Sequence, residues 1–144
     1  MAYAYFDTSA LIKRYVTEPG RREVLQLLRR NECVVSAVLP VEVRSALRRR
    51  VAEGTLDATR VPRILKRFTA DRAFWTFVED SREVLAAAEA LCAAHPLRAL
   101  DAIHVATAEV LLAEGAGEAL EFWTHDDRQA IAALSRGLTV RGTS

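Results

Sequence analysis

The sequence predicts an α/β domain with a mostly parallel five-stranded sheet covered by helices on both faces. Three observations support this prediction. Short apolar runs alternate with segments of helical periodicity, as in strand–helix–strand units. The chain has 144 residues, 51% of them hydrophobic, which is enough for one domain with its own core. No internal repeat, low-complexity tract or linker divides it, so we expect a single domain over residues 1–144.

The expected strands are short runs rich in apolar, aromatic and β-branched residues. Each run lies between loop residues or the ends of predicted helices, which is the setting of strands buried in a parallel sheet. The five predicted strands span residues 3–6, 33–36, 74–78, 120–124 and 138–141.

The expected helices show apolar residues at helical spacing, and characteristic residues mark several of their ends. Gly20 and Gly54 follow predicted helices, while Ser81 caps an alanine-rich helix that Pro96 closes. Pro62 is expected to bend or shorten the helix in which it lies. The seven predicted helices span residues 9–16, 21–30, 40–53, 57–69, 81–95, 97–114 and 127–136.

Composition excludes several classes of protein. The two cysteines, Cys33 and Cys92, are too few for a disulfide scaffold and form no CxxC pair for zinc or redox chemistry. No stretch approaches the ~20 apolar residues of a membrane span, and the apolar run at residues 2–6 is too short for a signal peptide. We therefore expect a cytoplasmic protein with no membrane association.

The charges are distributed unevenly along the chain. The formal net charge is only +1, which neither indicates nor excludes a nucleic-acid partner. Residues 1–72, however, carry 15 basic and 8 acidic side chains, whereas residues 73–144 carry 5 and 11. Seven of the basic residues lie within residues 48–67. This cluster is compatible with a solvated helix face and with a rim that binds phosphates.

Four acidic residues lie at predicted strand ends or on apolar helix faces. Asp7 follows the first strand and Asp126 lies just past the fourth, where the active sites of parallel sheets form. Glu42 is flanked by apolar residues, and Asp101 lies in residues 99–113, of which eleven of fifteen are apolar. Each acid alone could be a helix cap or a partner of the helix dipole, although a helix that starts at residue 97 would put Asp101 beyond its first turn.

Together, the four acids predict converging carboxylates that share a divalent cation. Ligation by oxygen alone favours Mg²⁺ or Mn²⁺ over zinc. The histidines lack the spacing of zinc proteases, so we expect His104 behind the metal ligands or in the core, and His125 in a loop.

Four segments of the chain resemble the PIN-domain family, most closely its VapC-type toxins: YFDTSALIKRYVTEPG, LPVEVRSALRR, LRALDAIHVATA and WTHDDRQAIAA. They occur in the order typical of the family and span nearly the whole chain. The resemblance implies a Rossmann-like three-layer sandwich and a metal-dependent endoribonuclease that acts as a toxin. It also implies a VapB-type antitoxin that blocks the site, an RNA substrate and, commonly, a homodimer.

The resemblance further implies roles for individual residues. The acidic quartet of the family falls on Asp7, Glu42, Asp101 and Asp126. These would bind Mg²⁺ or Mn²⁺, although Glu42 could instead orient the attacking water. Ser9 and Thr124 match hydroxyls beside the quartet, and the Thr-x-Asp spacing selects Asp126 over the adjacent Asp127. The arginines expected to contact single-stranded or looped RNA are Arg48, Arg49, Arg63 and Arg67.

Other functions are compatible with parts of this pattern. A catalytically inactive PIN-like module that binds RNA or protein is the main alternative, and the complete quartet argues against it. Asp7 could be a phosphatase nucleophile, but haloacid-dehalogenase-type chemistry needs an Asp where Ser9 stands. A receiver domain needs a late lysine, whereas Lys13 and Lys66 both lie in the first half. No glycine-rich phosphate loop indicates a kinase or dehydrogenase.

Overall fold

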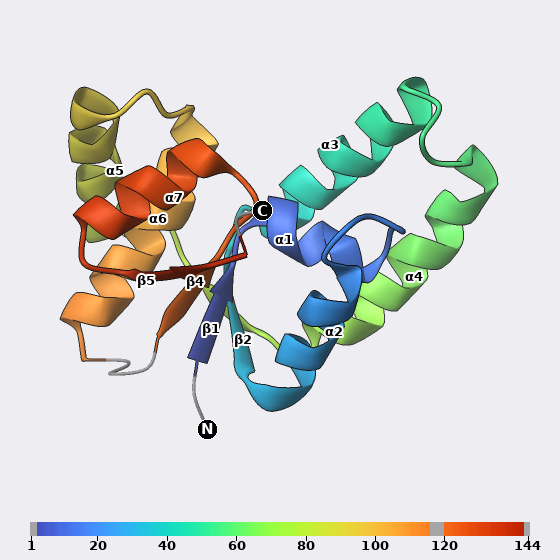
Figure 1. The fold of residues 1–144 in the computed structure, drawn as a ribbon, viewed down its shortest axis with the longest axis horizontal. Coiled ribbons are helices and arrows are strands. Elements are labelled where there is room, and N and C mark those ends of the chain that lie inside the picture. Colours follow the sequence, from blue (N-terminus) through green and yellow to red (C-terminus); the bar gives the residue numbers. More distant parts are fainter. Residues whose placement is uncertain (1–2, 116–119, 143–144) are drawn as a thin grey trace.

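A five-stranded parallel sheet forms the centre of the molecule in a computed structural model that describes residues 3–115 and 120–142 (Figure 1). The strand order is β3-β2-β1-β4-β5, and all four neighbouring pairs are parallel. The strands are β1 (Tyr3–Phe6), β2 (Glu32–Ser36), β3 (Thr76–Val78), β4 (Glu121–Trp123) and β5 (Thr139–Arg141). The predicted α/β class and strand number are confirmed, while the outermost residues of the predicted domain, 1–2 and 143–144, lie outside the described part.

Helices cover both faces of this sheet. They are α1 (Thr8–Leu11), α2 (Arg21–Arg30), α3 (Leu39–Ala52), α4 (Val61–Arg72), α5 (Arg82–Ala94), α6 (Ala99–Ala113) and α7 (Asp127–Ser135). Two 3₁₀ turns, η1 (Ile12–Arg14) and η2 (Ala58–Arg60), precede α2 and α4. In Figure 1, α1 to α4 lie on one side of the sheet and α5 to α7 on the other, which confirms the three-layer sandwich.

The two faces of the sheet bury separate apolar cores, because successive strand residues point in opposite directions. Ala4 and Phe6 of β1 pack in the core beneath the first four helices. Tyr5, between them, packs in the other core and stacks on Phe122 of β4 with ring centroids 5.3 Å apart. No helix within the described residues is long and apolar enough to span a membrane.

Several element boundaries differ from the prediction. The first helix stops at Leu11 and continues as a 3₁₀ turn rather than running to residue 16. Phe74 does not belong to the third strand: its N–H bonds to the carbonyl of Asp71 at the end of α4, and its side chain is 87% exposed. Pro62 shortens the predicted helix rather than bending it: α4 begins at Val61 instead of residue 57, and Pro62 lies in its first turn, where an N–H would have no acceptor within the helix.

Helices α3 and α4 lie beside the sheet, and side-chain contacts join the end of α4 to residues 14 and 15. Asp71 of α4 accepts hydrogen bonds from Arg14 Nε at 2.8 Å and from the Tyr15 hydroxyl at 2.6 Å. Phe68 packs edge-on against the Tyr15 ring, with centroids 5.7 Å apart. These contacts hold the end of α4 against the segment that follows α1.

Candidate active site

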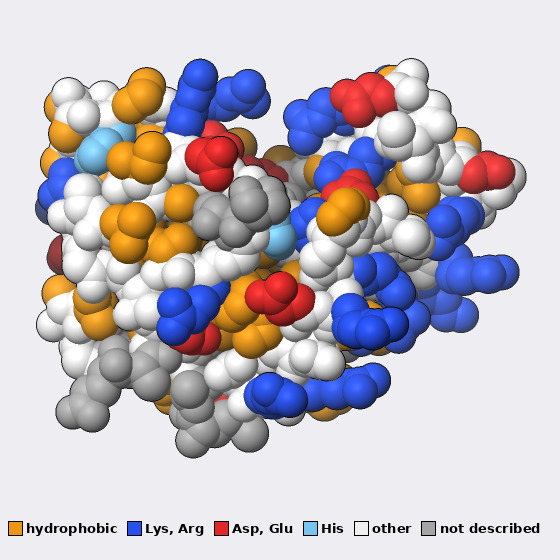
Figure 2. Space-filling view, in the orientation of Figure 1, with side chains coloured by type: hydrophobic (Ala, Val, Ile, Leu, Met, Phe, Trp, Pro, Cys, Tyr) orange, Lys and Arg blue, Asp and Glu red, His pale blue; other side chains and the backbone are white. Residues whose placement is uncertain are grey.

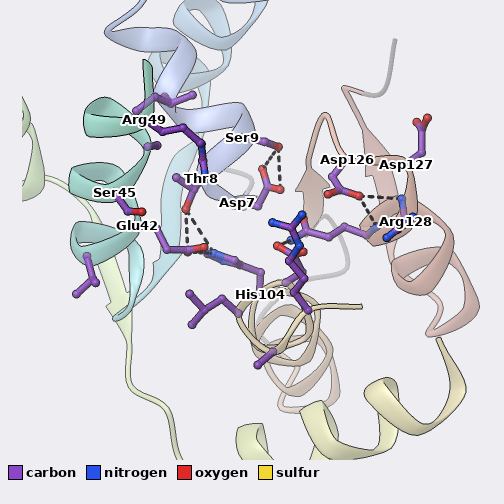
Figure 3. A pocket seen from close by; sticks show the side chains of 18 of the residues that line it. Asp7, Thr8, Ser9, Glu42, Ser45, Arg49, His104, Asp126, Asp127 and Arg128 are labelled. Carbon is purple, nitrogen blue, oxygen red and sulfur yellow. Dashed lines mark hydrogen bonds and ion pairs between the residues drawn. The ribbon is translucent and has the colours of Figure 1, made fainter. Parts of the chain in front are cut away.

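A cavity of about 850 Å³ opens at the carboxyl edge of the sheet, between the start of α3 and the starts of α6 and α7 (Figure 3). The surface is hollowed here in the space-filling view (Figure 2). Four separate segments contribute the four predicted acids to the cavity wall: Asp7 after β1, Glu42 in α3, Asp101 in α6 and Asp126 before α7. The structure thus brings together all four acids that the sequence singled out.

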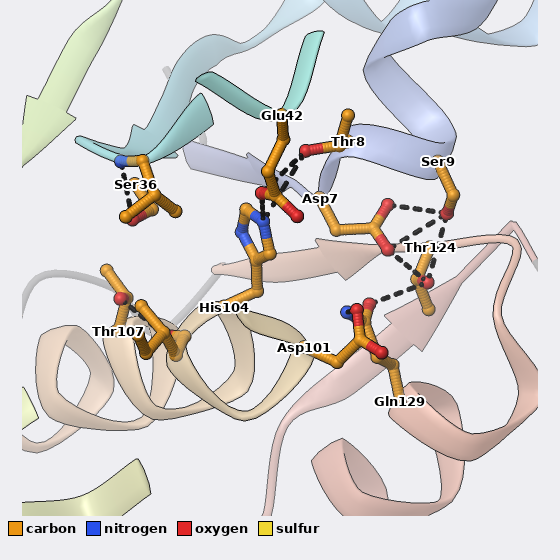
Figure 4. Close-up of polar contacts among 12 residues, drawn as sticks. Asp7, Thr8, Ser9, Ser36, Glu42, Asp101, His104, Thr107, Thr124 and Gln129 are labelled. Carbon is orange, nitrogen blue, oxygen red and sulfur yellow. Dashed lines mark hydrogen bonds and ion pairs between the residues drawn. The ribbon is translucent and has the colours of Figure 1, made fainter. Parts of the chain in front are cut away.

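Asp7 is the most buried of the four, with only 2% of its surface exposed. It caps α1, since Oδ1 accepts the Ala10 N–H at 2.9 Å, and the Ser9 hydroxyl donates to the same oxygen at 2.8 Å. Oδ2 accepts from Thr124 Oγ1 at 2.7 Å, so both hydroxyls named in the sequence analysis contact Asp7 (Figure 4). Burial raises the pKa of Asp7, although the charge of His104 and these hydrogen bonds oppose the rise.

Glu42 is held by two side chains from different elements. The Thr8 hydroxyl donates to Glu42 Oε1 at 2.9 Å, and His104 Nε2 forms an ion pair with the same oxygen. Behind the imidazole, the Tyr5 hydroxyl lies 2.7 Å from His104 Nδ1. His104 therefore lies behind an acid of the cavity wall, buried to 1% exposure.

The pKa value of each member of this pair shifts in the direction that favours its charged form. Burial alone would raise the pKa of Glu42, but the hydrogen bond and charge of His104, with the Thr8 hydroxyl, lower it. Burial alone would lower the pKa of His104, but the hydrogen bond and charge of Glu42 and the charges of Asp7 and Asp101 raise it.

Asp101 and Asp126 both line the cavity, and their charges interact. Asp101 is half-buried, and burial, followed by the charges of Asp126 and Glu42, raises its pKa. Asp126 caps α7 by accepting the N–H groups of Arg128 at 2.9 Å and Gln129 at 3.1 Å. Asp127 also lines the cavity but is exposed, and its side chain points away from Asp126 in Figure 3.

The helix that carries Asp101 starts later than predicted. It begins at Ala99, because Pro96 interrupts the chain and Arg98 is extended with ψ of 157°. Asp101 consequently lies in the first turn, where the helix dipole favours a carboxylate. A carboxylate at residue 101 is therefore favoured by the helix dipole and also lines the cavity.

Gln129 is a buried site residue that the sequence analysis missed. Its Nε2 donates to Asp101 Oδ1 at 3.0 Å, and its Oε1 accepts from Thr124 Oγ1 at 3.0 Å. It thereby joins the Thr124–Asp7 pair to Asp101. Its spacing of three residues from Asp126 was an available signal, because residues i and i+3 share a helix face.

Gln129→Ala is expected to lower the free energy of unfolding by about 1–3 kcal/mol, because it leaves a void and removes the donor to Asp101. Ile131→Ala is the matched control, since Ile131 lies on the same helix with 62% of its surface exposed. Urea unfolding of the two variants measures the difference. Equal stability of both variants would show that the Gln129 bridge contributes nothing to the fold.

Four arginines line the same cavity: Arg49, Arg50, Arg98 and Arg128. Only Arg49 is among the four predicted RNA contacts; Arg48, Arg63 and Arg67 are exposed but lie outside the cavity lining. Arg48 lies outside the lining because residues 42, 45, 46 and 49 share one face of α3, whereas residue 48 lies on a different face. Figure 2 shows Lys and Arg gathered over the half of the molecule that contains α3 and α4.

The donor set suits a hard divalent cation, since all four predicted ligands are carboxylates around one cavity. In the part of the chain that the structure describes, however, no three His, Cys, Asp or Glu side chains are grouped closely enough to hold an ion. The acids instead accept hydrogen bonds from neighbouring hydroxyl, amide and imidazole groups. A cation would offset the negative charges of Asp126 and Glu42, which add to the effect of burial in raising the pKa of Asp101.

A parallel sheet with converging acids at its carboxyl edge defines a Rossmann-like domain with an acidic site. The sequence profile of the PIN domain family matches residues 4–134, and the chain belongs to this family. No curated protein sequence is significantly similar to the chain.

The solved structures with a similar fold include the following three. A toxin–antitoxin complex from Klebsiella pneumoniae is 23% identical with a TM-score of 0.62, over 88% of each chain. FitAcB from Neisseria gonorrhoeae is 17% identical with a TM-score of 0.69, over 95% of each chain. VapBC2 from Rickettsia felis, bound to a DNA fragment from its promoter, is 11% identical with a TM-score of 0.63, over 99% of each chain.

Proposed function

We propose that this chain, as a single PIN domain over residues 1–144, is a Mg²⁺- or Mn²⁺-dependent endoribonuclease of the VapC type. The observation that carries the proposal is the shared cavity, which collects one carboxylate from each of four segments far apart in the sequence. Membership of the PIN domain family supports the same activity. The protein would act on RNA in the cytoplasm.

In this proposal, Asp7, Asp101 and Asp126 hold the metal. A bound Mg²⁺ or Mn²⁺ lowers the pKa of a coordinated water and offsets negative charge on the scissile phosphate. The Ser9 and Thr124 hydroxyls fix the rotamer of Asp7, and Gln129 fixes that of Asp101. These residues would orient the carboxylates.

Glu42 has a different task from the three aspartates. Because His104 and Thr8 hold it charged and fixed at the cavity wall, it either joins the metal ligands or orients the attacking water. The arginines at the rim attract the RNA backbone, which the acidic cavity would otherwise repel. Single-stranded or looped RNA is the substrate class that suits such a site.

We further propose that a VapB-type antitoxin neutralises the enzyme and that the toxin forms a homodimer. The toxin–antitoxin complex among the similar structures supports the first partner. At the cavity, Val41 is 71% exposed and Leu100 is 41% exposed, which provides apolar contacts for a segment that covers the opening. Size-exclusion chromatography with light scattering tests the dimer.

The purified chain is expected to cut single-stranded RNA in the presence of Mg²⁺ or Mn²⁺ and to lose this activity with EDTA. Gel analysis of end-labelled RNA measures cleavage, and restored cutting after excess Mn²⁺ excludes damage by the chelator. RNA that binds the protein but stays intact with either ion would favour the inactive module instead.

A further inference from the structure

A second cavity, of about 450 Å³, lies directly beside the acidic one. Its walls come from the loop at residues 16–18, the last part of α3 and residues 55–60. Arg49 and Arg50 line both cavities, so the two spaces meet at these side chains. The two cavities are therefore neighbours on the surface.

The two cavities differ in charge. Five acids and four arginines line the first, whereas Arg49, Arg50 and Arg60 face only Glu18 and Glu53 in the second. Glu18 is already engaged, because it accepts from Arg50 Nε at 2.7 Å and from Arg50 NH2 at 3.3 Å. Within residues 3–115 and 120–142, neither Arg49 nor Arg60 forms an ion pair, so both guanidinium groups are available to an anion.

We propose that the second cavity is a subsite for a backbone phosphate of single-stranded RNA, adjacent to the scissile phosphate in the acidic cavity. Arg49 lies at the junction, Arg60 lies in the far wall, and Arg50 is held by Glu18 as part of the wall. This inference rests on the proposed nuclease function and adds the direction in which the strand leaves the site. It also separates Arg49 and Arg60 from Arg48, Arg63 and Arg67, which line neither cavity.

A nucleic acid fits this subsite better than an acidic peptide. The planar fork of arginine binds phosphate oxygens in pairs, and a phosphodiester backbone presents one charge per nucleotide at regular intervals. A flexible single strand can span two neighbouring cavities, whereas a duplex is stiff. Thr17 and Thr55 add hydroxyls to the lining, which suit the sugar–phosphate backbone.

Binding of a fluorescently labelled single-stranded RNA, followed by anisotropy in EDTA over a series of salt concentrations, tests the subsite. Arg49→Ala and Arg60→Ala should each weaken binding about fivefold and reduce the slope of log K against log salt by about 0.7. Arg30→Ala is the control, because Arg30 is exposed at the end of α2, near the opposite edge of the sheet. All three arginines are exposed, so the variants should unfold at the same temperature as the parent.

Binding by Arg60→Ala that equals binding by Arg30→Ala would overturn the subsite. Displacement of the RNA by poly-glutamate at equal charge concentration would also overturn it, in favour of an acidic peptide. The nuclease proposal fails separately: RNA held through Arg49 and Arg60 but never cut with Mn²⁺ would refute cleavage and leave the subsite intact. Conversely, normal cutting and binding by Arg60→Ala would refute only the subsite.

Discussion

Asp101→Asn is expected to reduce RNA cleavage by at least about 100-fold, more than the loss typical of residues that only orient a metal ligand. The substitution removes one negative charge from the group that would hold the cation. Asn retains an oxygen that can accept from Gln129 Nε2, which lies 3.0 Å from Asp101 Oδ1, so the fold should persist. The cleavage rate with Mn²⁺, measured beside far-ultraviolet circular dichroism, checks both parts.

The same substitution should stabilise the folded protein at neutral pH. Burial and the charges of Asp126 and Glu42 raise the pKa of Asp101 above its ordinary value of 3.8, so the folded state binds the proton more tightly than the unfolded state. The stability from this group is fully present below pH 3.8 and is lost as the pH rises through the folded pKa. Asp101→Asn should therefore raise the unfolding temperature at neutral pH and lose this advantage in acid.

Asp127→Asn is the matched control for both effects, because it alters an exposed acid in the same cavity. It should leave cleavage and the unfolding temperature nearly unchanged. Normal turnover by folded Asp101→Asn would refute the assignment of the site, whatever the behaviour of the control.

His104→Ala is expected to destabilise the protein by about 3 kcal/mol, the cost of leaving one member of a buried ion pair alone. His104 is 1% exposed, and its removal deprives Glu42 of its counter-charge and the Tyr5 hydroxyl of its partner. His104→Gln should cost less, since an amide N–H can still donate to Glu42. Urea unfolding of the two variants gives the comparison, and equal losses would mean that neither the volume nor a neutral hydrogen bond at this position stabilises the fold.

The Glu42–His104 pair also predicts a pH dependence. The lowered pKa of Glu42 makes its stabilisation present above its ordinary value of 4.5 and lost as the pH falls through the folded pKa. The raised pKa of His104 makes its stabilisation present below 6.5 and lost as the pH rises through the folded pKa. The stability gap between the parent and Glu42→Gln should be largest between pH 4.5 and 6.5, and a gap that is constant with pH would contradict the pair.

Much of the site could be predicted because strand ends constrain position strongly. Asp7 and Asp126 follow β1 and β4, which pair in parallel, so their carboxylates must lie near one edge of the sheet. Asp101 could be identified because an acid in an apolar helix needs a polar environment. These inferences depend only on local pattern and on the geometry of a parallel sheet.

Other features depend on contacts between distant segments. Phe74 has the composition of a strand residue, yet it follows α4 directly and its backbone closes the last turn of that helix. Gln129 has an ordinary helical setting in the sequence, and only the packing of α7 against α6 places its amide beside Asp101. Which arginines of α3 line the cavity depends on the rotation of this helix about its axis, and side-chain packing in the core sets that rotation.

The sequence by itself determined the class of fold, the order of the elements and the four acids at its carboxyl edge, because local periodicity and strand order control these properties. Only the tertiary structure determined which hydroxyls, amides and arginines surround the acids. It also placed a second cavity beside the first. Those contacts depend on how helices are rotated and docked, and this orientation is set by the sum of many small packing interactions rather than by any local pattern.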